Sequence, residues 1–107
     1  MVMIMVTSWY PPDKAIEVAK KFLEGMQKFP QESFEKPLVL AGVSSVKDGI
    51  RGITITEVEK GKYEEALSLE AKRLVEYMSI EGYKFKMETL MTIEEAMPLV
   101  GLEMPSA

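Results

Sequence analysis

The chain has 107 residues, 47% of them hydrophobic, which suits one domain with a single core. It contains no Cys and no His, so disulfides, thiolate metal sites, a Ser-His-Asp triad and a Cys-His pair are excluded within one chain. A net charge of −4 argues against nucleic acid, whose phosphates need a basic surface. No apolar run could cross a bilayer and the short apolar start lacks a basic flank, so we expect no membrane partner, no signal peptide and a cytoplasmic location.

The first predicted elements are a strand over Val2–Tyr10 and an amphipathic helix over residues 13–28. Both faces of the strand are largely apolar, which is typical of a central strand that is covered on both sides. Pro11 and Pro12 end the strand, because proline cannot donate to a sheet ladder. Apolar residues then recur at helical spacing from Ala15 to Met26, and Phe29-Pro30 ends the helix.

A β-hairpin is predicted next, with strands over Pro37–Val46 and Ile50–Val58. The second of these alternates and is rich in β-branched residues, and the pair Asp48-Gly49 before it is a strong hairpin signal. Gly42 interrupts the first strand and indicates a bulge or a close approach by another group.

The last part of the chain predicts a helix over Tyr63–Glu81, ended by Gly82, and a fourth strand over Tyr83–Met91. Charges alternate with apolar residues along this strand, which favours a partly solvated edge. Residues 92–95 form a capping-box pattern that opens a short helix, and an apolar tail over 99–107 follows.

This order of elements is the split β-α-β arrangement of an α+β, ferredoxin-like βαββαβ domain spanning 1–107. Two helices should cover one face of a four-stranded antiparallel sheet and leave the other face open. We expect Met3, Met5, Trp9 and either the Tyr83–Phe85–Met87 row or its alternate on the open face. Such a face is too apolar for water, so we expect a second copy to cover it in a homodimer.

From Met1 to Val100 the order of elements and the polarity of the faces resemble the dimeric α/β-barrel superfamily, in which two ferredoxin-like subunits pack sheet to sheet. That resemblance implies a fold shared by cofactor-free and haem-linked monooxygenases, chlorite dismutase-like enzymes and muconolactone isomerases. Haem and catalytic groups in the superfamily are often His, and this chain has none. We therefore expect no cofactor and no metal.

The residues singled out for ligand binding are Trp9, Arg51, Tyr83, Met5 and Phe85. We expect them to bind a small apolar or aromatic molecule in the sheet-lined interior. One alternative is a cofactor-independent monooxygenase or isomerase, in which Arg51 would stabilise an enolate beside Trp9 and Tyr83. Another is a structural or regulatory interaction module. Trp9 as a packing plug and Arg51 paired with a strand carboxylate are the simpler roles, so the sequence leaves open whether the protein is an enzyme.

Overall fold

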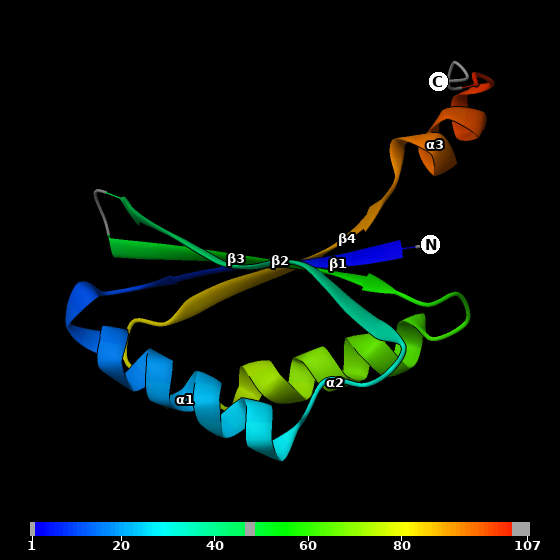
Figure 1. Cartoon of the computed structure of the whole chain (residues 1–107). Coiled ribbons are helices and arrows are strands. Elements are labelled where there is room, and N and C mark those ends of the chain that lie inside the picture. The colour runs from blue at the N-terminus through cyan, green and yellow to red at the C-terminus, as the bar shows by residue number, and fades with distance from the viewer. Residues whose placement is uncertain (1, 47–48, 104–107) are drawn as a thin grey trace.

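The computed structural model describes residues 2–46 and 49–103, with the backbone alone over 40–46. It contains a four-stranded antiparallel sheet with α1 and α2 on one side, an α+β architecture (Figure 1). The elements in chain order are β1 (Val2–Tyr10), a 3₁₀ turn η1 (Pro12–Lys14), α1 (Ala15–Lys28), β2 (Glu35–Val46), β3 (Gly49–Val58), α2 (Tyr63–Val75), β4 (Lys84–Met91), α3 (Ile93–Ala96) and a 3₁₀ turn η2 (Met97–Val100).

The strands lie in the order β2-β3-β1-β4, so the predicted central position of β1 and the predicted edge position of β4 are confirmed. β1 has the predicted bounds and pairs with β3 along its whole length, from Val2↔Val58 to Tyr10↔Ile50. The register of β2 shifts between Val39 and Gly42, where the sequence predicted an irregularity. Asp48 of the predicted turn lies outside the described residues.

The core lies between the sheet and the helices. Ile4 and Val6 of β1 and Val58 of β3 pack there with Ala66 and Leu74 of α2, and Val58 is fully buried. Because strand side chains alternate between faces, the burial of Ile4 and Val6 places Met3, Met5 and Trp9 on the opposite, open face.

The sheet register decides which row of β4 faces which side. Val6 pairs with Met87 and Ser8 with Phe85, and paired residues share a face. The row that begins at Tyr83 therefore lies on the helix side. Lys84, Lys86, Glu88 and Leu90, the alternate row, are on the open face, which has an apolar centre and charged margins.

The second helix is shorter than predicted, since α2 ends at Val75 rather than Glu81. Beyond it the chain tightens: the N–H groups of Glu76, Tyr77 and Met78 each donate to a carbonyl three residues back. Gly82 has a φ of +82° and turns the chain into β4, as its position after a helix suggested. This turn brings the ring of Tyr77 toward the start of β4.

Residues 92–103 form a C-terminal arm that stands away from the rest of the molecule, on the side of the sheet opposite α1 and α2 (Figure 1). The predicted capping box is confirmed at its start: the Glu95 N–H donates to Thr92 Oγ1 over 3.2 Å, and the Thr92 N–H donates to Glu95 Oε1 over 3.4 Å. Leu99 and Val100 on the arm are 74% and 71% exposed. In the described part of the chain, no helix has the length and apolar character needed to cross a membrane.

Candidate functional site

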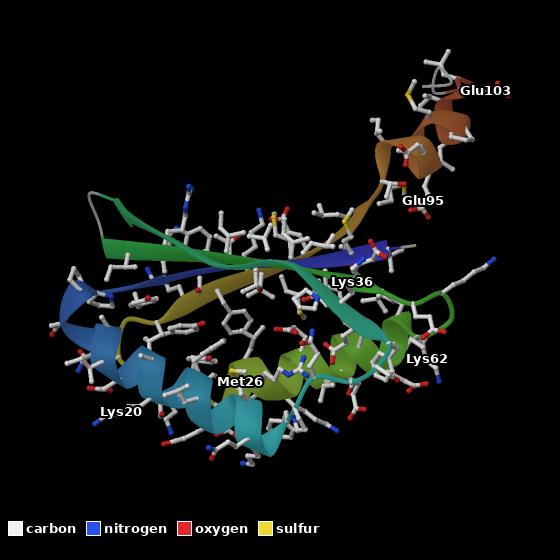
Figure 2. The ribbon with its side chains drawn as sticks, viewed as in Figure 1. Lys20, Met26, Lys36, Lys62, Glu95 and Glu103 are labelled. Carbon is white, nitrogen blue, oxygen red and sulfur yellow. The ribbon has the colours of Figure 1, made fainter. Side chains whose placement is uncertain are left out.

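A cavity of about 250 Å³ lies between the helix side of the sheet and the two long helices. β1 contributes Val6, Ser8 and Tyr10 to its wall, and α2 contributes side chains from the opposite side. α1 lines it with Phe22, Gly25 and Met26, and Figure 2 shows Met26 projecting toward the sheet. The complete wall comprises Val6, Ser8, Tyr10, Phe22, Gly25, Met26, Phe29, Gln31, Glu35, Pro37, Gly52, Ile53, Thr54, Thr56, Glu70, Arg73, Leu74, Tyr77 and Tyr83.

Gly25 explains why the cavity remains open along α1. It is buried in the interior of the helix, yet a Cβ built on it would meet nothing within 4 Å. A helix-interior glycine costs roughly 0.5–1 kcal/mol relative to alanine. An alanine side chain would therefore fit at position 25, and the packing of this chain does not explain why a glycine stands there.

One wall of the cavity is a stack of three tyrosine rings. Tyr83 lies between Tyr77, at a centroid distance of 4.8 Å, and Tyr10, at 6.1 Å, and both pairs are within 13° of parallel. Burial raises the pKa of Tyr77 and of Tyr83, while a hydrogen bond with Ser8 opposes the rise at Tyr83. The phenols therefore keep their protons at neutral pH and can donate hydrogen bonds.

The other end of the cavity is built around Arg73 of α2. Its guanidinium binds the Glu35 carboxylate in a two-pronged pair, Nη1 to Oε2 at 2.7 Å and Nη2 to Oε1 at 3.0 Å. It also donates to the carbonyl oxygens of Phe29 and Pro30, both over 3.1 Å. Arg73 thus ties α2 to the connection between α1 and β2, and its role is structural.

Glu70, one turn before Arg73, is the acidic side chain of the cavity wall that is least committed to structure. Among the described residues it accepts one hydrogen bond, from Arg73 Nη1 to Oε2 over 3.2 Å. Burial raises the pKa of Glu70, while the charge and the hydrogen bond of Arg73 oppose the rise. A carboxyl group of this kind can accept a hydrogen bond from a ligand or exchange a proton with it.

The five residues singled out from the sequence are divided between the two faces of the sheet. Trp9 pairs with Arg51 across β1 and β3, and these two share the open face with Met5. Tyr83 lines the cavity on the helix side, and the Phe85 ring lies 6.4 Å from the Tyr83 ring. The division follows from the alternation of side chains, because the pairing of Trp9 with Lys84 sends Tyr83 and Phe85 to the other side.

Sequence reasoning missed Gly25, Glu70 and Arg73. The spacing of Glu70 and Arg73, three residues apart in a helix, places them on one face and was a usable signal. Nothing local connects Glu35 or Gly25 to them, since these residues come from other elements. Within residues 2–46 and 49–103, no group of three acidic side chains lies close enough to hold a metal ion.

Comparison with known proteins adds a likeness of fold. No protein-family model matches the chain, and no curated protein matches it. A solved structure described as the de novo designed protein Foldit4 superposes with a TM-score of 0.57 at 13% identity. The match covers 85% of this chain and 96% of the designed one. At that identity the likeness concerns the fold alone, so the function has to be argued from the cavity.

Proposed function

We propose that this protein binds a small, flat aromatic molecule that carries a hydrogen-bond donor, in the cavity between the sheet and the helices. The observation that carries the proposal is the unfilled space beside Gly25, opposite a wall of stacked tyrosines. Aromatic walls with a few polar groups are typical of small-molecule sites. The sequence-based expectation had the same class of ligand on the open face, whereas the cavity lies on the other side of the same sheet.

The polar groups of the wall define the ligand further. The tyrosine hydroxyls can donate or accept, and the Glu70 carboxylate accepts. An aromatic phenol or amine would satisfy Glu70 and place its ring against Tyr77 or Tyr83. A purely hydrocarbon ring would leave the buried carboxylate without a new donor, so it should bind more weakly.

The binding proposal is tested by calorimetric titration with 2-naphthol and with naphthalene. We expect 2-naphthol to bind more tightly than naphthalene. In Glu70→Gln the ratio of the two dissociation constants should fall about tenfold, which corresponds to about 1.4 kcal/mol of binding free energy. Gly25→Leu should fill the cavity and abolish binding of both. Gly25→Ala, the matched control, adds a methyl group only and should retain binding. Equal binding to wild type and Gly25→Leu would refute the location.

We further propose that the domain is ferredoxin-like and forms a homodimer through its open face. The order βαββαβ and the strand order support the first statement. Met3 and Met5 of β1, with Ile55 of β3 paired beside Met5, support the second, because they are apolar and lie on a face that none of the described residues covers. Sedimentation velocity over a dilution series tests it, and a species that stays monomeric at every concentration would reject it.

A further inference from the structure

The charges that β3 and β4 place on the open face are sorted along these two strands. Arg51 of β3 and Lys84 of β4 both pair with Trp9 of β1, so they flank it on either side at one end of the face. Lys86 follows on β4. Toward the opposite end lie Glu88 of β4 and Glu57 of β3, with Lys36 of β2 paired beside Glu57. The basic and acidic halves meet where Lys86 and Glu88 approach to 3.7 Å.

We infer that a second copy covers this face with its strands running in the opposite direction, related by a two-fold axis perpendicular to the strands. This inference rests on the homodimer proposed above and specifies its geometry. Such an axis places each strand over the same strand of the other copy. It also places the Arg51 end of one sheet over the Glu57 end of the other. Arg51 then faces the partner's Glu57, and Lys86 faces the partner's Glu88. Each contact occurs twice by symmetry.

The other face-to-face arrangement does not match the charges. A two-fold axis parallel to the strands keeps like ends together and places β3 over β1 of the second copy. Arg51 would then lie against the partner's Trp9, and Glu57 against the partner's Met3. The apolar centre is buried in both arrangements, so apolar area does not distinguish them. Charge pairing favours the antiparallel stack, because it gives Arg51 a carboxylate across the interface, and an unpaired charge inside an interface is costly.

The C-terminal arm fits the same arrangement. It leaves β4 at the Glu57 end and rises on the side of the open face, and Figure 2 shows Glu95 and Glu103 on it, far from α1 and α2. In the antiparallel stack this end lies over the partner's Trp9. The arm can offer it the exposed apolar side chains of Leu99 and Val100. Glu94, exposed on α3, would approach the partner's Lys84.

Charge reversal tests the direction of stacking. We expect Arg51→Glu and Glu57→Arg each to weaken the dimer at least tenfold, because like charges then face each other at two symmetric places. An equimolar mixture of the two variants should dimerise as tightly as wild type, since both facing pairs of the mixed dimer again have opposite charges. Lys20→Glu, a reversal on the outer face of α1, is the matched control and should leave dimerisation unchanged. Sedimentation equilibrium gives the dissociation constants.

The outcomes separate the inference from the proposals on which it rests. Dimerisation of either single variant at wild-type strength would overturn the antiparallel stack, as would a mixture no tighter than its components. If a single variant fails to fold, the double variant Arg51→Glu/Glu57→Arg decides, because it should dimerise like wild type. A wild-type protein that stays monomeric would reject the homodimer and the stack together. The aromatic cavity would be unaffected by that result, since one chain forms it alone.

Discussion

Arg73 is the residue whose loss should most disturb the support of the cavity. Its guanidinium makes five hydrogen bonds, two of them to a Glu35 carboxylate that is 2% exposed. In Arg73→Met the Glu35 carboxylate would keep one hydrogen-bond donor among the described residues, the Glu32 N–H at 3.1 Å. Stranding one member of a buried ion pair costs about 3–5 kcal/mol.

This cost is large beside the total stability of a small domain, about 5–15 kcal/mol. With a urea m-value of about 1–3 kcal/mol/M, the unfolding midpoint should fall by about 2 M. Circular dichroism of urea-unfolded samples measures this shift. Lys72→Met, at an exposed neighbouring position on α2, is the matched control and should change the free energy of unfolding by no more than about 0.5 kcal/mol.

The double variant Arg73→Met/Glu35→Met separates a stranded charge from a lost contact. Replacing both partners removes the stranded Glu35 charge, and Glu70 loses Arg73 equally in both variants. The double variant should therefore be more stable than Arg73→Met alone. If Arg73→Met lies within about 1 kcal/mol of wild type, or if the double variant is the less stable of the two, the reasoning fails.

Three other outcomes are expected. Gly25→Ala should raise the free energy of unfolding by about 0.5–1 kcal/mol, because the methyl group meets no atom within 4 Å and alanine favours the helix. A thermal melt that shows destabilisation would contradict the open space beside α1. Because burial raises the folded-state pKa of Glu70, the contribution of this residue to stability should be greatest below pH 4.5 and should decline as pH rises through the folded-state pKa. The decline should disappear from the curve of unfolding free energy against pH for Glu70→Gln, and identical curves for the two proteins would argue against the shift. At a concentration at which the protein is dimeric, the fluorescence emission of Trp9, the single tryptophan, should lie at longer wavelength in Val100→Asp than in wild type. An unchanged spectrum would mean that the arm does not lie over the partner's Trp9.

The sequence predicted the elements where local pattern and local chemistry agree. β1 has the predicted bounds, β3 begins one residue before its predicted start, and the capping box at Thr92 is formed as expected. The second helix is predicted too long, because Met78 continues the apolar pattern of the helix although its backbone already turns toward Gly82. Local pattern contains no information about that tertiary turn.

The candidate site was harder to predict, for two physical reasons. A one-residue change of register exchanges the two faces of a strand, so the side on which Tyr83 lies could not be read from alternation alone. The ion pair between Arg73 and Glu35 joins residues 38 apart in the chain, and no local spacing indicates it. Gly25 carries no side chain, so its importance depends on empty space that only a folded structure reveals.

The two edges of the sheet carry a consequence for how the protein can associate. β2 bears Pro37, which lacks an N–H group, and its register is irregular; β4 bears Lys84, Lys86 and Glu88. Proline, bulges and charged side chains all oppose the addition of a further strand to a sheet edge. Addition of further chains at the edge strands β2 and β4, which would extend the sheet into a fibre, is therefore disfavoured. A protein with an apolar open face is in this way directed toward closed assemblies of limited size.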